Sequence, residues 1–285
     1  MGRINYTNQH FLISDELARQ VVDLAEVKRE DVVLEIGPGK GILTRHLSKQ
    51  ARKVVAIEKD SSMIPHLTEL EEECPNVSII YGDALSSKWP KRANRLISNI
   101  PFNISEPLIN RLFGENLEES VLFVGERLAE EMSYAARGKP RTRLGLLSSC
   151  YFTIETLLDV DRDKFDPIPA TDARVISLTP LRNGRLRGDQ NRQIIRYIWD
   201  QGRKPVGIGL EGALANFTYH NFPNSQYIPS YQFVSELGIP DRVLGKPTRS
   251  LTGDELILIH DALRDKKFAK KLRNKARRFS YGDYS

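Results

Sequence analysis

The chain has 285 residues and a formal net charge of +5, from 42 lysines and arginines against 37 aspartates and glutamates. Its hydrophobic fraction of 40% is ordinary for a globular protein, and its length fits two domains. No apolar run approaches the roughly 20 residues that cross a bilayer, and residues 1–6 lack the apolar core of a secretory signal. Neither the 2 cysteines nor the 5 histidines have metal-ligand spacing. These features argue against a membrane protein and against a structural metal site, and they favour a cytoplasmic protein.

Helix and strand patterns alternate in the first part of the chain. The first helix is predicted to begin after Ser14, whose hydroxyl can cap it, with Leu17 and Val21 on its apolar face. Ser105 is predicted to cap a later helix in the same way. The alternation predicts a Rossmann-like α/β fold, a mostly parallel sheet with helices on both faces. The predicted strands are residues 32–36, 54–57, 77–80, 96–98 and 121–124.

The rest of the chain has a different pattern. Residues 137–143, rich in Gly and Arg, are predicted to form a mobile basic loop, and a further strand is predicted at residues 174–179. The polar stretch at residues 181–191 is typical of a linker, and the sequence after it has helical periodicity. We therefore predict two domains, residues 1–184 and a smaller, mostly helical domain over residues 185–285.

A glycine-rich turn follows the first predicted strand. Residues 35–41 are Glu-Ile-Gly-Pro-Gly-Lys-Gly, and Gly37 and Gly39 allow the backbone to approach a nucleotide-like cofactor closely. A dinucleotide-binding turn needs its third glycine where Ile42 stands, so the spacing favours a turn that holds S-adenosylmethionine. Glu35, at the start of the turn, is assigned to the same site. The alternative is that the glycines form only a tight turn.

Acidic residues stand at the ends of the next two strands. Glu58 directly follows the strand at residues 54–57, where a carboxylate can accept hydrogen bonds from both hydroxyls of a ribose. Asp83 follows the strand at residues 77–80, where it can accept a hydrogen bond from the cofactor's adenine amine. The small Ala84 leaves room beside it. The alternative for either acid is a solvated loop carboxylate.

The fourth strand is followed by Asn99-Ile100-Pro101-Phe102, a turn suited to a planar base. The Asn99 side-chain oxygen and the Ile100 carbonyl can accept the two hydrogens of an exocyclic amine. Pro101 stiffens the turn, and Phe102 can stack on the base. An isolated Asn-x-Pro sequence often only begins a turn.

The four motifs are more informative together than separately. They fall at successive strand ends, and the carboxyl ends of the strands form the edge at which open α/β sheets bind ligands. This order predicts methyl transfer from S-adenosylmethionine to the exocyclic amine of a base.

The positive charge is concentrated near the C-terminus. Residues 264–278 contain nine lysines or arginines and one acid, which leaves 42 − 9 = 33 basic and 37 − 1 = 36 acidic residues elsewhere, a net charge of −3. Such a segment suits the phosphates of a nucleic acid, because their neutralisation releases counterions. The alternative is a solvated helix end or a flexible tail.

These motifs resemble those of the KsgA family of ribosomal RNA adenine dimethyltransferases, which also includes the Erm resistance methyltransferases. The resemblance covers nearly the whole chain. Residues 8–12, Asn-Gln-His-Phe-Leu, resemble the family's N-terminal cofactor motif, which implies that Gln9, His10 and Leu12 lie over the cofactor. Phe165 begins a sequence that resembles the family's Phe-x-Pro-x-Pro, which implies a second aromatic ring near the target base.

The C-terminal part favours the KsgA branch, because residues 237–239 and 249–252 resemble its C-terminal domain and Erm members match there less well. Other positions depart from the family pattern. A paralogue with a changed ribosomal target is therefore a second hypothesis. The departures are Asn8, Phe102 in place of the usual Tyr, Gly125-Glu126-Arg127, Leu144 and residues 170–173.

The resemblance implies an enzyme that dimethylates the N6 amine of adenines in small-subunit (16S) rRNA, at adjacent adenines of a hairpin loop near the 3′ end. It implies a monomer with S-adenosylmethionine as cofactor, which acts on rRNA within a small-subunit assembly particle. Two alternatives remain at this point. One is the same chemistry on large-subunit or another RNA, and the other is a ribosome-binding factor without catalysis.

Overall fold

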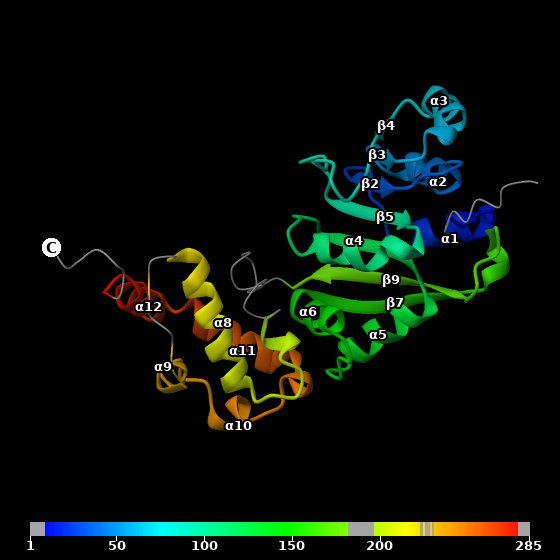
Figure 1. Cartoon of the computed structure of the whole chain (residues 1–285). Helices are drawn as coiled ribbons and strands as arrows, with labels where there is room; N and C mark the ends of the chain where they lie inside the picture. The colour runs from blue at the N-terminus through cyan, green and yellow to red at the C-terminus, as the bar shows by residue number, and fades with distance from the viewer. Residues whose placement is uncertain (1–8, 182–196, 223–224, 226–228, 230, 279–285) are drawn as a thin grey trace, which may run out of the picture. The chain divides into compact units, whose positions relative to one another are not determined.

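The structure is a computed structural model and forms two compact units (Figure 1). The first comprises Met1–Ala136 and Phe152–Pro180, and the second comprises Arg137–Tyr151 and Leu181–Ser285. The predicted domain boundary at residues 184/185 lies outside the described residues, as does nearly all of the predicted linker. The structure describes residues 9–181, 197–222, 225, 229 and 231–278.

The first unit is built on a seven-stranded sheet with the strand order β4-β3-β2-β5-β6-β9-β7. The strands from β4 to β6 are parallel, and β9 pairs antiparallel with both β6 and β7. The Rossmann-like α/β fold predicted from the alternating pattern is confirmed. The strands are β2 (Val32–Ile36), β3 (Lys53–Glu58), β4 (Val77–Tyr81), β5 (Arg95–Asn99), β6 (Glu119–Gly125), β7 (Phe152–Val160) and β9 (Ala173–Pro180).

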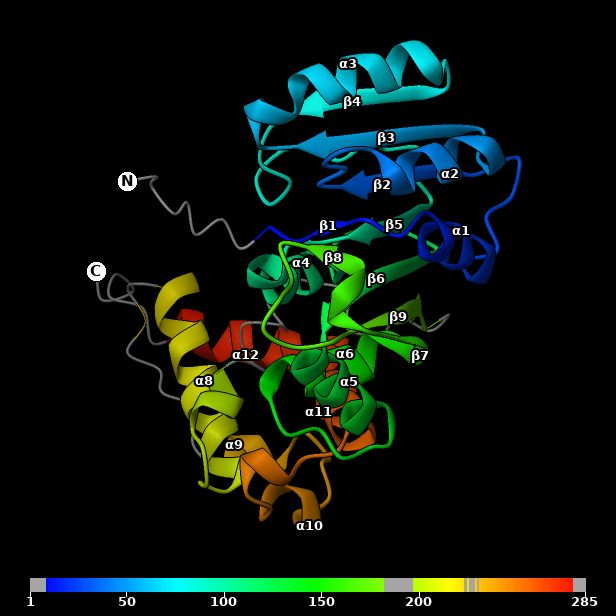
Figure 2. The ribbon, with the colours of Figure 1, turned by 90° about the vertical axis from the view of Figure 1, so that its right-hand side faces the viewer.

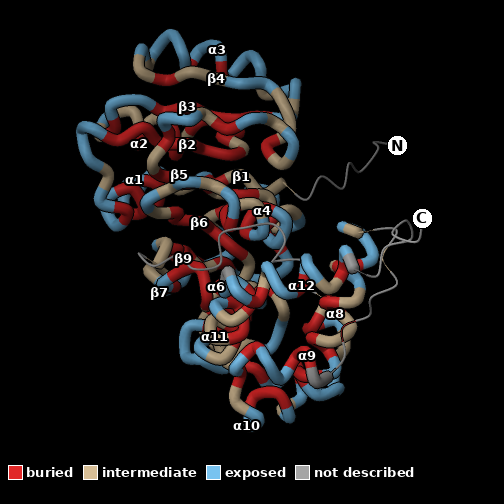
Figure 3. The backbone as a smooth tube through the Cα atoms, turned by 90° about the vertical axis from the view of Figure 1, so that its left-hand side faces the viewer, coloured by how far each residue is buried: buried red, intermediate tan, exposed pale blue. Residues whose placement is uncertain are grey.

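The strand order reverses between β2 and β5, which is where such sheets open a ligand crevice. Every residue of β2 is buried, as expected for a parallel strand covered on both faces (Figure 3). Helix α1 packs against α2, and α5 packs against β7 and β9. The helices of this unit are α1 (Asp15–Leu24), α2 (Ile42–Gln50), α3 (Ile64–Glu73), α4 (Ser105–Leu112) and α5 (Glu126–Ala136).

Two serines that were predicted to cap helices behave differently. The Ser14 hydroxyl accepts the backbone N–H of Leu17 at 3.2 Å, so α1 begins as predicted. The prediction for Ser105 is wrong, because Ile104 occupies the cap position and Ser105 is the first residue of α4. The 3₁₀ turn Phe102–Ile104 precedes this helix and takes the place of a side-chain cap.

A second, two-stranded sheet was not predicted. Strand β1 (Phe11–Leu12) pairs antiparallel with β8 (Phe165–Asp166), two segments far apart in the sequence (Figure 2). The Ile13 N–H extends this pairing by donating to the Lys164 carbonyl at 3.0 Å. The pairing brings the N-terminal segment to the Phe165 loop.

The second unit is helical in its described elements. Helix α6 packs against α11, which begins with a capping box formed by Thr252 and Glu255. The predicted loop at residues 137–143 ends where α6 begins, at Arg143. The longer helices are α6 (Arg143–Tyr151), α8 (Val206–Asn221), α11 (Gly253–Arg264) and α12 (Lys266–Arg278), with short helices α9 (Tyr231–Ser235) and α10 (Asp241–Leu244).

Helix α12 forms most of the basic segment. Its apolar side chains Phe268, Leu272 and Ala276 recur every four residues and are buried, with the Phe268 ring 4.9 Å from that of Phe233. Most of the lysines and arginines between them are exposed. Within the described residues, no helix has the length and apolarity needed to cross a bilayer.

Candidate active site

The glycine turn after β2 is shaped for close backbone approach. Gly39 has a φ of +54°, and a Cβ added there would lie 2.7 Å from Cδ1 of Phe11, so no other residue fits without displacing that ring. Gly37 also has a positive φ, and its N–H donates to the Ile57 carbonyl at 2.9 Å. The turn is therefore held between β3 on one side and the β1 segment on the other.

Glu58 ties this turn to the end of β3. Its carboxylate is buried and accepts the Gly39 N–H at 3.2 Å and the Asp60 N–H at 2.8 Å, one on each oxygen. A carboxylate oxygen has a second acceptor position. Two acceptors on a fixed carboxylate suit a pair of neighbouring hydroxyls.

Asp83 lies on the loop after β4. One of its oxygens accepts the Leu85 N–H at 2.8 Å, and the other contacts Nζ of Lys59 at 3.0 Å. The bond from Leu85 and then that from Lys59 lower the pKa of Asp83, so its carboxylate is ionised at neutral pH. Lys59, which directly follows Glu58, had not been singled out from the sequence.

These strand ends border one cavity of about 510 Å³. Its size suits a cofactor-sized ligand. The predicted residues Ile100, in the core, and Phe102 do not border it. The predicted residues that line it are Gln9, Gly37, Glu58, Asp83, Ala84 and Pro101.

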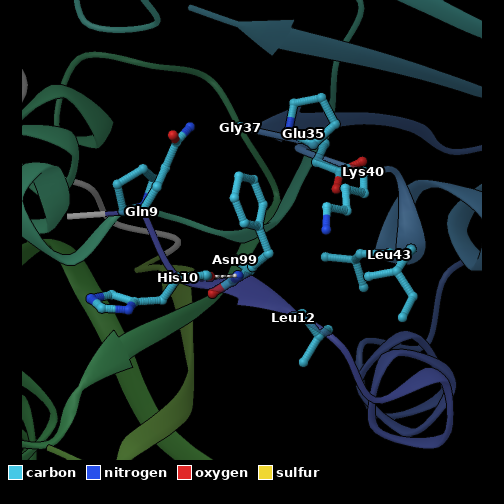
Figure 4. Close-up of a pocket in the computed structure, with 12 residues that line it drawn as sticks. Gln9, His10, Leu12, Glu35, Gly37, Lys40, Leu43 and Asn99 are labelled. Atoms are coloured by element: carbon cyan, nitrogen blue, oxygen red, sulfur yellow. Dashed lines mark hydrogen bonds between the residues drawn. The ribbon is translucent and has the colours of Figure 1, made fainter. Parts of the chain in front are cut away.

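A smaller cavity of about 30 Å³ lies beside the glycine turn (Figure 4). Glu35 borders it and is 1% exposed, with no hydrogen-bond partner for its Oε2 among the described residues. Burial, with a smaller contribution from the Glu58 charge, raises the pKa of Glu35 from 4.5 to about 8. Glu35 is therefore mostly protonated at neutral pH. Gln9, His10, Leu12, Lys40 and Asn99 border the same cavity.

Asn99 ends β5 with its side chain held in one orientation. Its Nδ2 donates to the His10 carbonyl at 3.0 Å (Figure 4). The side-chain oxygen is thereby left to accept a hydrogen bond from another group. Pro101 follows with a φ of −55°, and its carbonyl accepts the Ile104 N–H at 3.0 Å, which closes the turn.

Three aromatic rings support the turn. The Phe102 ring lies 5.8 Å from that of His10 and 6.3 Å, edge-on, from that of Phe165. Phe165 is fully buried, and the centre of its ring also lies 6.1 Å from that of Phe123. Phe165 thus lies in the core behind Phe102 and offers no exposed face of its own, whereas the resemblance implied a ring beside the base. Phe102 packs over Gly125, where a Cβ would lie 3.5 Å from its ring.

The N-terminal motif reaches this site through tertiary contacts. Nδ1 of His10 lies 2.6 Å from the Pro167 carbonyl, and Leu12 is buried beside Phe165 through the β1–β8 pairing. The sequence supplied these residues only through the family resemblance, because no local pattern indicates the pairing.

The sequence profile of the family described as "Ribosomal RNA adenine dimethylase" matches residues 2–216. The chain belongs to this family. It is an rRNA adenine dimethyltransferase, as the order of the motifs and the resemblance predicted.

Relatives of this rRNA adenine dimethylase agree with the match. A "Probable ribosomal RNA small subunit methyltransferase A" of Thermococcus gammatolerans is 36% identical over 203 residues, which cover 71% of this chain and 72% of the relative. A dimethyladenosine transferase from Plasmodium falciparum is similar in structure, with a TM-score of 0.75, 26% identity and coverage of 91% of this chain and 98% of that one. The 23S rRNA methyltransferase ErmE shares the fold, with a TM-score of 0.63, 20% identity and coverage of 89% and 99%.

Proposed function

We propose that this rRNA adenine dimethyltransferase binds S-adenosylmethionine in the 510 Å³ cavity and dimethylates adenine N6 in small-subunit rRNA. The observation that carries this proposal is the arrangement of Asn99. Its Nδ2 donates to the His10 carbonyl, while its oxygen remains an acceptor at the small cavity beside the glycine turn. Gln9, Gly37 and Pro101 line both that cavity and the larger one, which Glu58 and Asp83 line.

The residues of the cavity fit S-adenosylmethionine. Glu58 would accept both ribose hydroxyls, and Asp83 would accept the adenine amine, with Ala84 leaving space for the ring. When bound, the cofactor supplies a methyl group on a positively charged sulfur.

The methionine part of the cofactor would lie along the glycine turn. Gly37 lines both cavities and would let the backbone of the turn approach the cofactor closely, and Glu35 borders the smaller cavity. Gly39 would shape the turn from the other side, where it makes room for Phe11. Gln9, His10 and Leu12 would cover the cofactor from the β1 segment.

To bind the substrate, the chain needs hydrogen-bond acceptors for the amine and an aromatic ring that stacks on the base, but no strong base. The lone pair of the adenine amine is delocalised into the ring, so the amine must be held while that pair localises on nitrogen. The Asn99 oxygen and the Ile100 carbonyl would accept its two hydrogens. Phe102 would stack on the base, which is worth about 1–3 kcal/mol, and Phe165 would support Phe102 from behind. The target adenine must leave its stack, which costs least at weakly paired positions.

The relatives' names support small-subunit rRNA as the target, and adjacent adenines in a hairpin loop near the 3′ end remain the specific site we propose. We further propose a cytoplasmic monomer that acts on a small-subunit assembly particle. Residues 1–184 would form the catalytic domain, and residues 185–285 would contact RNA, with α12 providing the basic face.

The test is transfer of labelled methyl from S-adenosylmethionine to unmodified small subunits, large subunits and naked rRNAs, followed by nucleoside mass spectrometry. We expect dimethyladenosine only in small-subunit RNA and none with Asn99→Ala. Label confined to large-subunit RNA would overturn the proposed target. Absence of label despite measured cofactor binding would point to a different RNA substrate or assembly state.

A further inference from the structure

Arg111, near the end of α4, holds the loop that carries Asp83 and Ala84. Its Nη1 donates to the Ala84 carbonyl at 2.5 Å, and its Nη2 donates to the Ser87 carbonyl at 2.7 Å. Its Nε contacts Oε1 of Glu115 at 3.0 Å, which orients the guanidinium from the end of the same helix. The planar guanidinium thus donates hydrogen bonds to two backbone carbonyls of the same loop.

Trp89, on the loop itself, contacts both the Ala84 carbonyl and the Arg111 guanidinium. Its ring is nearly buried, and its Nε1 donates to the same Ala84 carbonyl at 2.9 Å. The guanidinium carbon of Arg111 lies 4.3 Å from the centre of the indole ring. The Ala84 carbonyl therefore accepts two side-chain hydrogen bonds, whose donors also stack on each other.

Helix α4 connects this loop to the base-binding turn. It begins at Ser105, directly after the 3₁₀ turn Phe102–Ile104, and Arg111 lies near its other end. Ala84 and Leu85 line the large cavity from the loop, and Asn103 and Ile104 line it from the turn before α4. Arg111 thus joins two walls of one cavity through a single rigid helix.

Resting on the proposed function, we propose that Arg111, with Trp89, is a positioning residue that sets the adenine-recognising loop at a fixed distance from the base-binding turn. Its partners are backbone carbonyls, so it acts through the loop and does not itself touch the cofactor. A loop must be held within a fraction of an ångström for Asp83 to select an amine over a carbonyl oxygen. Loss of the hydrogen bonds from Arg111 to the loop should therefore reduce both the affinity for the cofactor and the preference for its adenine amine.

The experiment measures binding without turnover. The dissociation constants of S-adenosylmethionine and of its analogue with hypoxanthine in place of adenine are measured by calorimetry for wild type, Arg111→Met and Arg111→Lys. We expect Arg111→Met to weaken S-adenosylmethionine binding about tenfold. We also expect the ratio between the dissociation constants of the two ligands to become smaller. Arg111→Lys keeps the charge but not the fork, so it should recover only part of the affinity.

The matched control is Arg19→Met, because Arg19 also pairs with an acid four residues later, Asp23 at 3.2 Å, on the exposed face of α1. This variant should bind both ligands as wild type does. Trp89→Phe is a second, milder test, since it removes the donor to Ala84 and part of the indole surface but leaves an aromatic ring for Arg111, and it should weaken binding severalfold in a folded protein.

Unchanged affinity and preference in folded Arg111→Met and Trp89→Phe would overturn the inference and leave the proposed function intact. The inference is equally overturned if both variants lose thermal stability while binding both ligands as wild type does. Wild-type protein that binds neither ligand would instead overturn the proposed function and, with it, the inference.

Discussion

At the scale of single residues, the site depends on polar side chains that are held in place by hydrogen bonds to the backbone and can still accept further ones. Asn99 donates to the His10 carbonyl and keeps its oxygen free, whereas both oxygens of Glu58 are already held by backbone N–H groups. Fixed donors and acceptors of this kind need no reorganisation when charge moves during a reaction. The sequence identified both residues, but only the structure distinguishes their states.

Replacement of Asn99 should separate chemistry from cofactor binding. Asn99→Ala removes the acceptor for the amine, so we expect kcat to fall by about 100-fold or more, with a much smaller change in the S-adenosylmethionine dissociation constant. Single-turnover methylation and calorimetry measure the two effects. Equal losses in both would indicate that Asn99 mainly holds the β1 segment through His10.

Glu35 should make stability depend on pH. The pKa of its buried carboxyl rises from 4.5 to about 8 on folding, so the folded state holds a proton that the unfolded state releases. This stabilisation is complete below about pH 4.5 and is lost as the pH rises toward 8, by up to about 1.4 kcal/mol per pH unit. Urea denaturation between pH 5.5 and 8 should therefore show a steeper decline for wild type than for Glu35→Gln. Parallel pH profiles would contradict the assignment.

At the scale of elements, helix starts show how position decides the role of a residue. Ser14 and Ser105 both precede apolar helical patterns, yet only Ser14 caps its helix. Ser105 is the first residue of α4, one position after the cap, and its buried hydroxyl has no hydrogen-bond partner among the described residues. The preceding Pro-Phe-Asn-Ile turn determines this shift, because its 3₁₀ geometry places Ile104 at the cap.

The two serines provide a matched pair. Ser14→Ala removes a cap and should lower the free energy of unfolding by about 1 kcal/mol. Ser105→Ala removes a buried, unpaired hydroxyl and should be neutral or slightly stabilising. Denaturant unfolding of both variants gives the comparison. A similar loss for the two would mean that the Ser105 hydroxyl finds a partner in solution.

At the scale of the whole molecule, charge is divided along the chain. Outside residues 264–278 the net charge is −3, from 33 basic and 36 acidic residues, so α12 carries the basic excess. Its buried apolar face presents the cations on a folded helix. The alternative of an unstructured tail therefore does not apply to residues 266–278.

Neutralising α12 should change salt dependence without changing the methylated nucleotide. Replacing the exposed Lys267, Lys270, Arg273 and Arg277 by Gln should reduce the slope of log affinity against log salt by up to about 0.9 for each RNA phosphate that is no longer neutralised. RNA binding across a salt series measures this slope.

The matched control neutralises four exposed cations at the opposite edge of the sheet from the candidate site. They precede or begin β3 and β5, so they lie at the amino ends of parallel strands, and their replacement by Gln should leave the slope unchanged. An equal effect in both sets would indicate only non-specific attraction. The four are Arg52, Lys53, Lys91 and Arg92.

Much of the fold and part of the site could be predicted from local patterns. Buried parallel strands give continuous apolar runs, and the turns after them need particular residues, so the ends at Gly37, Glu58, Asp83 and Asn99 were visible in the sequence. Strand β7 and the β1–β8 pairing could not be predicted from the sequence. Their strands are short or mixed in composition and carry weak periodicity, and strands can pair across long sequence distances.

The sequence by itself determined the α/β class, the order of the strand-end motifs and the family, since these depend on periodicity and on turn residues close together in the chain. Only the tertiary structure decided that Glu35 is buried and protonated, that Phe165 lies behind Phe102, and that Arg111 holds the Asp83 loop. The physical reason is that protonation, stacking and long-range hydrogen bonds depend on which distant residues surround a group, and no local pattern encodes those neighbours.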